Sequence, residues 1–414
     1  MEYHKISTSH VPSRPAPVPE ELVFPLLLHA GKPSEAIVKK GDIVKVGQLI
    51  AKAVSGISAN VHSSVSGEVV NIKDYPHPLG MDLPAIIIKN DFQYTKIDAA
   101  PLHSIKDATK EDLLKMIFDA GIVGMGGAAF PTHIKLNPTN KIKELIINAA
   151  ECEPYVTSDH RTIIEHTKKI FIGIEVMQKI LEPAMVYIGI EDNKQDAIRA
   201  LKNYSIQYKN IHVITLPTQY PQGAEKILVR QVTGKHVPHL PMEVGVVVVN
   251  VSTAAQIGMT ATSGLPLIER IVTIAGDLLE KKHNLQVRIG TPIKYLLAEL
   301  TPEKIQKISP FKILFGGPMM GLSQHNLDVP VLKGTTGILI MSNVVEQEST
   351  CLRCGRCVDN CPLYLMPVFA ANKGIQAAEC MECGLCAYNC PSKINLVQRI
   401  KLQKIMLAQK GKSK

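Results

Sequence analysis

The sequence predicts a multidomain protein of mixed α/β and β structure that ends in a small helical domain rich in cysteine. Three observations predict this. Short β-rich runs fill residues 22–91, helical patterns alternate with apolar runs over residues 102–262, and eight of the nine cysteines lie within residues 351–390. The chain of 414 residues also exceeds the roughly 100 to 200 residues of one typical domain, so we expect two to four domains.

Composition and charge favour a soluble globular protein. Hydrophobic residues make up 45% of the chain and charged residues 20%, which is the ordinary balance for chains that fold around buried cores. The most apolar run, Val244 to Val251, is far shorter than the roughly 18 residues that span a bilayer. The stretch from Leu22 to His29 is too short for a secretory signal and contains Pro25. We therefore expect a cytosolic chain.

The N-terminal quarter predicts an extended arm followed by an all-β module. Four prolines in residues 1–21 disfavour a regular helix there: Pro12, Pro15, Pro17 and Pro19. After residue 22, β-rich runs at Ala36–Lys39, Ile43–Ala53 and Gly67–Ile72 are separated by glycine turns. The phrases Lys40–Gln48 and Ser64–Val69 resemble the two halves of a biotinyl or lipoyl carrier domain, a barrel-sandwich hybrid. Because no lysine lies between these halves in residues 53–60, we interpret the module as a scaffold.

The middle of the chain predicts a parallel sheet with crossover helices. The expected helices are Glu111–Ala120, Thr162–Leu181 and Gln195–Asn203. The expected strands are Glu144–Asn148, Met185–Ile190, Ile211–Thr215 and Val246–Val251. A further β-rich piece with glycine turns, Leu267–Met341, predicts a third unit.

The eight C-terminal cysteines form two copies of the pattern C-x2-C-x2-C-x3-C-P, and in proteins with two 4Fe-4S clusters the fourth cysteine of each run ligates the other cluster. One predicted cluster has the ligands Cys351, Cys354, Cys357 and Cys390, and the other has Cys380, Cys383, Cys386 and Cys361. Disulfides and zinc sites are the alternatives, but disulfides rarely persist in cytosolic proteins and zinc sites usually pair two C-x2-C knuckles across a longer loop. The pattern therefore predicts one-electron transport.

A glycine-rich loop, Gly124 to Lys135, predicts a phosphate or cofactor site. Glycines let the backbone approach a phosphate and donate N–H groups to it, and Lys135 adds a positive charge. Tight helix packing is the alternative explanation of such a run.

Five motifs in register resemble the RnfC family, the NADH-facing subunit of the Rnf ion-translocating electron transport complex, and more distantly the flavin subunit of respiratory complex I. The motifs are the Gly124–Lys135 loop, Asn148–Tyr155, Tyr220–Glu225, Val249–Thr253 and Gly316–Gly321. The resemblance implies a Rossmann-like flavin domain of the complex I 51-kDa type. It also implies a β-grasp soluble-ligand-binding (SLBB-like) domain.

The resemblance further implies the residues of the site. FMN would contact Gly124, Gly126, Lys135, Asn148, Glu151, Tyr220, Gly223, Asn250 and Thr253. NADH would contact Phe130, Glu153 and Glu225. No catalytic residue beyond the cofactors is expected. The implied activity is NADH oxidation through FMN, with single electrons passing over two 4Fe-4S clusters towards ferredoxin.

The implied order of domains is an extended arm (1–21), a barrel-sandwich hybrid (22–100), an FMN/NADH domain (101–262), a β-grasp domain (263–342), a ferredoxin domain with two 4Fe-4S clusters (343–398) and a basic tail (399–414). Expected partners are other subunits of a membrane Rnf-type complex and ferredoxin, not nucleic acid. The implied location is peripheral, on the cytoplasmic side of the inner membrane. The alternatives are a soluble reductase of the cobalamin-reductase or proline-reductase-carrier type and a non-enzymatic electron-transfer adaptor.

Overall fold

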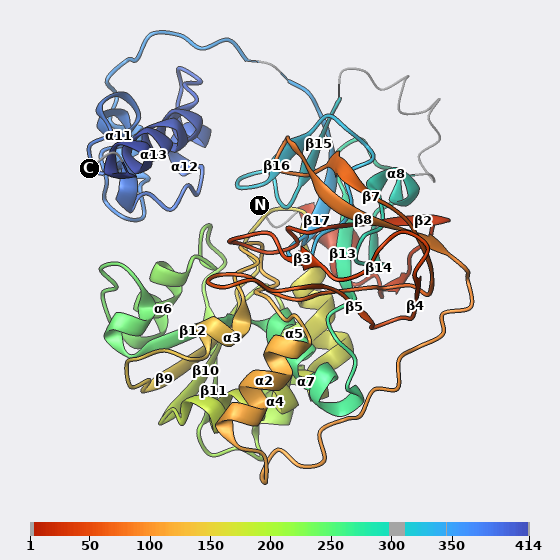
Figure 1. Cartoon of the computed structure of the whole chain (residues 1–414). Helices are drawn as coiled ribbons and strands as arrows, with labels where there is room; N and C mark the ends of the chain where they lie inside the picture. The colour runs from red at the N-terminus through yellow and green to blue at the C-terminus, as the bar shows by residue number, and fades with distance from the viewer. Residues whose placement is uncertain (1–3, 298–310, 345, 413–414) are drawn as a thin grey trace. The chain divides into compact units, whose positions relative to one another are not determined.

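The computed structural model describes residues 4–297, 311–344 and 346–412 (Figure 1). Contacts divide the chain into two compact units. The larger unit comprises Met1–Gly317 and Leu322–Ser342, and the smaller comprises Pro318–Gly321 and Asn343–Lys414. Across the described ranges, none of the helices combines the length and the apolar character that crossing a bilayer requires.

A four-stranded parallel sheet forms the centre of the larger unit, as the alternating pattern predicted. Its strand order is β11-β10-β9-β12. The strands are β9 (Glu144–Ala149), β10 (Met185–Glu191), β11 (Ile211–Leu216) and β12 (Val246–Asn250). Both faces are buried, which explains why these strands read as continuous apolar runs.

Helices cover both faces of this sheet. The helices of the domain are α2 (Lys110–Asp119), α3 (Thr132–Lys135), α4 (Ser158–Leu181), α5 (Gln195–Ser205), α6 (Glu225–Thr233), η2 (Pro241–Val244) and α7 (Val251–Ser263). Leu145 and Ile147 of β9 join the core formed with α4 and α7, whereas Ile146 packs with Leu228 and Val229 of α6. Alternate side chains of one strand thus enter two cores.

Two glycines allow α4 and α7 to cross in close contact. A Cβ atom at Gly173 would lie 1.9 Å from the Ala254 carbonyl oxygen, and one at Gly258 would lie 1.9 Å from the Lys169 carbonyl oxygen. A side chain at either position would therefore force the helices apart.

The N-terminal module contains two small sheets, with strand orders β2-β8-β7-β4 and β3-β5-β6. The strands are β2 (Glu21–Pro25), β3 (Glu35–Ala36), β4 (Ile43–Val44), β5 (Leu49–Lys52), β6 (Val61–His62), β7 (Gly67–Pro76) and β8 (Asp82–Asn90). Phe24, Ile50 and Ile88 are among the fully buried side chains of its core. The β-rich pattern of this region is confirmed.

The third part of the larger unit is a mixed sheet of order β1-β14-β13-β17-β15-β16. Its elements are β1 (Arg14–Pro15), β13 (Glu269–Ala275), β14 (His283–Arg288), α8 (Ile293–Leu296), β15 (Phe311–Phe315), β16 (Leu322–Gln324) and β17 (Gly337–Ser342). The first and last long strands, β13 and β17, lie side by side and parallel, and each has an antiparallel neighbour on its other side. This is the order that a β-grasp requires. Part of the third unit, residues 298–310, lies outside the described residues.

The N-terminal arm is more structured than the prolines suggested. Ile6–Ser9 form one helical turn, α1, and β1 pairs with β14. The first proline is Pro12, so nothing prevents a turn before it, and Asn284 Nδ2 donates a hydrogen bond of 2.8 Å to the Thr8 carbonyl oxygen. Tertiary contacts of this kind are not visible in the local sequence.

The smaller unit is helical, as expected of the cysteine-rich region. Its elements are α10 (Arg356–Asp359), α11 (Pro367–Lys373), η3 (Ala377–Glu379), α12 (Leu385–Tyr388) and α13 (Leu396–Lys412). The basic tail predicted for residues 399–414 is largely helix α13, and its last residues, Ser413 and Lys414, lie outside the described residues. Arg399 pairs with Glu348 at 2.6 Å, and Lys404 with Glu382 at 2.7 Å.

Candidate functional site

The predicted cofactor motifs meet at the carboxyl ends of β9 and β12. The chain runs from β9 outward to β10 and β11 and then returns to place β12 on the other side of β9. Open α/β sheets bind ligands at this kind of topological switch point. Asn148 and Asn250 are register partners at these two strand ends.

The glycine-rich loop is closed at its neck by backbone hydrogen bonds. Gly124 N–H donates to the Phe130 carbonyl oxygen at 2.8 Å, and Ala129 N–H donates to the Gly124 carbonyl oxygen at 3.1 Å. Residues 126–128 at the apex are exposed, and Gly127 has a φ of +114°, which favours glycine. Their N–H groups have no hydrogen-bond acceptor among the described residues. Successive free N–H groups of this kind can bind an anion.

The loop packs directly on the start of α7. Met125 N–H donates to Thr253 Oγ1 at 2.8 Å, and a Cβ atom at Gly126 would lie only 3.0 Å from Asn250 Nδ2. Asn250 in turn caps α7, because its Oδ1 accepts from the N–H of Ser252 at 2.9 Å and of Thr253 at 3.3 Å. The structure therefore brings together Gly126, Asn250 and Thr253, which the sequence placed in one site.

The second and third motifs also meet. Asn148 Nδ2 donates to the Gly223 carbonyl oxygen at 2.8 Å, and Gly223 N–H donates to Cys152 Sγ at 3.4 Å. A Cβ atom at Gly223 would lie 2.3 Å from the Ala150 carbonyl oxygen, so only glycine fits there. Tyr220 is buried two residues before Gln222.

Lys135 and Glu225 form an ion pair, with 2.5 Å between Nζ and Oε1. The sequence assigned the lysine to FMN and the glutamate to NADH. Both side chains are partly exposed, at 26% and 42%, so solvent screens the pair and either partner can turn to a ligand at little cost.

The carboxylate of Glu151 is already engaged within the protein. It accepts hydrogen bonds from the N–H of Asp159 at 2.8 Å and of His160 at 3.2 Å, at the first turn of α4. It therefore neutralises the start of that helix. A cofactor contact by this carboxylate stays a prediction, and the contacts in the structure give it a structural role.

The two remaining residues predicted for NADH are half-buried. Glu153 lies against the backbone of Gly317, where a Cβ atom would come within 2.1 Å of Glu153 Oε2. Phe130 is the last residue of the glycine loop's neck. Their roles stay predictions.

A buried charged group beneath the loop was missed by sequence reasoning. Arg270 of β13 is 4% exposed, and its Nη1 donates to the carbonyl oxygens of Met125 at 3.1 Å and of Lys333 at 2.5 Å. Burial lowers the pKa of Arg270 to about 10, against the opposing effects of Asp159 and Glu151. The available signal was an arginine inside the apolar run of β13.

Asp159 is the acidic partner of this buried group. It accepts hydrogen bonds from Asn250 Nδ2 at 2.7 Å and from Ser252 Oγ at 2.5 Å. Burial raises the pKa of Asp159 to about 6, and the nearby charge of Glu151 acts in the same direction. Asp159 thus links the caps of α4 and α7 under the glycine loop.

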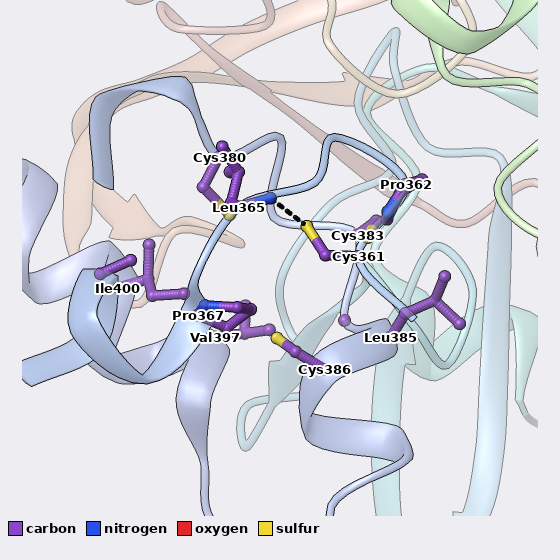
Figure 2. A pocket seen from close by; sticks show the side chains of 12 residues that line it. Cys361, Pro362, Leu365, Pro367, Cys380, Cys383, Leu385, Cys386, Val397 and Ile400 are labelled. Atoms are coloured by element: carbon purple, nitrogen blue, oxygen red, sulfur yellow. Dashed lines mark hydrogen bonds between the residues drawn. The ribbon is translucent and has the colours of Figure 1, made fainter. Parts of the chain in front are cut away.

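The smaller unit contains a cavity lined by four cysteines: Cys361, Cys380, Cys383 and Cys386 (Figure 2). These are the four residues predicted for the second cluster, including the one supplied by the first run. Backbone N–H groups donate to two of the sulfurs, from Leu365 to Cys361 Sγ and from Glu382 to Cys380 Sγ, each at 3.3 Å. Such bonds stabilise thiolates and tune cluster potentials. Leu365, Pro367, Val397 and Ile400 form the apolar lining.

The first predicted cluster site is more exposed. Cys351 and Cys354 are exposed, and Cys357 and Cys390 are half-buried. Burial raises the pKa of Cys357, and the nearby thiols of Cys390 and Cys351 raise it further, so Cys390 lies near the first run. In the described part of the chain, no three His, Cys, Asp or Glu side chains are placed to hold a single metal ion.

The two cysteine runs are structural repeats offset by 29 residues. Helices α10 and α12 follow this offset, and so do residues with positive φ at Arg353 and Glu382, at Gly355 and Gly384, and at Tyr364 and Lys393. Asn360 and Asn389 each donate a hydrogen bond from Nδ2 to the carbonyl oxygen four residues earlier, at 2.8 and 3.0 Å. The same local backbone is therefore built twice.

Comparison with known proteins finds three family profiles along the chain. Residues 1–93 match the RnfC barrel-sandwich hybrid domain, residues 117–259 match the Nuo51 FMN-binding domain, and residues 343–391 match a 4Fe-4S dicluster domain. The predicted fold class and cofactor classes are confirmed by these matches.

Curated relatives are similar over most of the chain, and each is the RnfC-type subunit of its complex. The one from the proton-translocating ferredoxin:NAD(+) oxidoreductase complex of Clostridium ljungdahlii is 44% identical, over 87% of this chain and 80% of the relative. The one from the Na(+)-translocating ferredoxin:NAD(+) oxidoreductase complex of Acetobacterium woodii is 40% identical, over 88% and 84%. The one from the ion-translocating oxidoreductase complex of Rhodobacter capsulatus is 41% identical, over 91% and 74%.

Among solved structures, a chain of NAD+-reducing [NiFe]-hydrogenase in its H2-reduced state matches with a TM-score of 0.48 and 17% identity, over 75% of this chain and 57% of that chain.

Proposed function

This chain belongs to the RnfC family, and from that membership we propose that it takes hydride from NADH onto FMN and passes single electrons through two 4Fe-4S clusters towards ferredoxin. The proposal extends to its setting, as one component of a membrane-bound, ion-translocating complex and peripheral on the cytoplasmic side. The single observation that carries it is one chain holding an FMN-binding domain and a 4Fe-4S dicluster domain.

The glycine loop suits an anionic cofactor group. Three consecutive N–H groups at residues 126–128 are free among the described residues and exposed, and Lys135 supplies a mobile positive charge nearby in sequence. When bound, FMN converts a two-electron hydride transfer into single-electron transfers. We propose that Gly124, Gly126, Lys135, Asn148, Tyr220, Gly223, Asn250 and Thr253 hold it, with Glu151 supporting the site from the cap of α4.

Phe130, Glu153 and Glu225 are proposed to orient NADH. Glu225 is the acidic partner of Lys135, so binding of an anionic cofactor to the lysine would release the carboxylate for a ribose hydroxyl. That exchange gives the ion pair a function beyond stability, since a partly exposed pair contributes only about 0 to 1 kcal/mol.

The clusters are proposed to be cross-ligated as the spacing predicts, with Cys390 completing the first site and Cys361 the second. The cavity lined by Cys361 together with Cys380, Cys383 and Cys386 supports this assignment. We also propose the domain boundaries 1–21, 22–100, 101–262, 263–342, 343–398 and 399–414.

Anaerobic purification followed by NADH titration tests the function. We expect about eight irons and one FMN per chain, with bleaching of flavin and cluster absorbance on addition of NADH. Protein that bleaches with dithionite but not with NADH would contradict the proposed NADH site and favour an electron-transfer adaptor. A Lys135→Met variant should lose NADH bleaching together with FMN content, whereas Lys115→Met, which alters an exposed pair on α2, should keep both.

A further inference from the structure

The glycine loop is held from outside its own domain as well as from within it. The Gly121 carbonyl oxygen accepts from Lys333 Nζ at 2.8 Å, and the Met125 carbonyl oxygen accepts from Arg270 Nη1 at 3.1 Å. Both donors belong to the β-grasp part of the chain. The barrel-sandwich part adds a third contact, from Ala30 N–H to the Ala129 carbonyl oxygen at 2.9 Å.

Met125 is the residue at which these contacts control the apex. Its N–H is bonded to Thr253 of α7 and its carbonyl group to Arg270 of β13, so its conformation is fixed from two sides. The next two residues are glycines, which have the largest conformational freedom to lose on ordering. A fixed Met125 therefore limits the range of conformations that the free N–H groups of the apex can explore.

The Arg270 side chain has few alternative positions. It is almost fully buried, donates to two backbone carbonyl groups, and faces the carboxylates of Asp159 and Glu151, whose charges favour the protonated guanidinium. Arginine suits this position because its rigid fork can serve two acceptors at once. Asp159 in turn contacts Asn250 and Ser252, so one buried network joins the β-grasp strand to the cap of α7.

We propose that Arg270 is a positioning residue of the flavin site: through its hydrogen bond to Met125, the β-grasp domain holds the glycine loop in the conformation that binds FMN. This inference rests on the proposed function, since it assumes that the loop binds the cofactor. Arg270 acts through the Met125 peptide group and not by touching the cofactor.

Titration of FMN into the cofactor-free full chain tests the proposal, followed by flavin fluorescence. Arg270→Met should weaken FMN binding by about 10- to 100-fold, the usual effect of losing a hydrogen bond to a charged group. Arg270→Lys, which keeps the charge but not the fork, should recover part of that loss. Hydrogen exchange should speed up in the peptide covering residues 121–130, whose amides at Gly124, Met125 and Ala129 are bonded in the native loop.

Arg288 provides a matched control. It lies on the adjacent strand β14, donates to the Ser64 carbonyl oxygen of the barrel-sandwich part and stacks 4.6 Å above the Tyr94 ring, so these contacts lie outside the glycine loop. Arg288→Met should lower thermal stability while leaving FMN affinity and loop exchange unchanged.

Three results are decisive. Equal FMN affinity and equal loop exchange in wild type and Arg270→Met would overturn the proposal. An equal loss of affinity in Arg270→Met and Arg288→Met would also overturn it, because the effect would then be general destabilisation. If the wild-type chain itself does not bind FMN, the proposed function fails, while faster loop exchange in Arg270→Met alone would still support the positioning role.

Discussion

The close crossing of α4 and α7 predicts a large effect from a single methyl group. In Gly258→Ala the new Cβ atom would lie 1.9 Å from the Lys169 carbonyl oxygen, whereas real Cβ contacts are essentially never below 3.0 Å. The helices must therefore move apart locally by about 1.1 Å, the difference between these distances. Overpacking of this kind costs about 3 kcal/mol, and replacing a helical glycine by alanine returns about 1 kcal/mol.

The expected net loss for Gly258→Ala is about 2 kcal/mol, or a fall of about 4 to 8 °C in Tm for a domain of this size. Thermal unfolding followed by circular dichroism measures it. Gly124→Ala is the control, because its Cβ atom would have its nearest neighbours in Phe130 at 3.7 Å and so fits without displacement. The Tm of the control should stay within about 1 °C of wild type. Equal Tm values for the two variants would refute the reasoning.

Three further predictions concern thiols and a buried histidine. Cys361→Ser should lose about half of the iron, from the second cluster, and Cys390→Ser about half from the first; iron analysis with electron paramagnetic resonance distinguishes cross-ligation from ligation within each run. Burial, and then the charge of Lys333, lowers the pKa of His62 to about 3 from 6.5. The unfolded chain therefore binds a proton below pH 6.5 that the folded chain does not, so stability falls with pH by about 1.4 kcal/mol per unit. His62→Gln should reduce the fall in Tm between pH 6.5 and 5, and an unchanged slope would contradict this. Burial raises the pKa of Cys152 to about 12, so iodoacetamide at pH 8 should label the cluster cysteines of the iron-free chain well before Cys152; equal labelling by mass spectrometry would count against this assignment.

Elements with strong periodicity could be predicted from the sequence. The run Val246–Val251 predicted a buried strand, and β12 occupies Val246–Asn250. The strand ends one residue early because Asn250 turns its side chain to cap α7. The parallel arrangement also followed from the alternation of helices and strands, because the crossover connection restricts the topology to few choices.

Contacts between distant segments could not be predicted. The turn at Ile6–Ser9 depends on Asn284, far along the chain, and the cap of α4 depends on Glu151, which the motif alone assigned to a cofactor. Arg270 carried no motif at all. Local patterns report local geometry, whereas these side chains have their roles because of what the fold places beside them. The grouping of Cys361 with the second run is an exception, because short spacing within a repeat limits what each sulfur can reach.

The outside support of the glycine loop has a consequence for how the protein is made. Met125 is synthesised 145 residues before Arg270, and Gly121 is synthesised 212 residues before Lys333. At about 5 to 20 residues per second, the ribosome needs roughly 10 to 40 s to cover the longer interval. During that time the nascent loop lacks two of its anchors. Flavin loading is therefore a late event in biogenesis, completed only after the β-grasp segment has left the ribosome and docked.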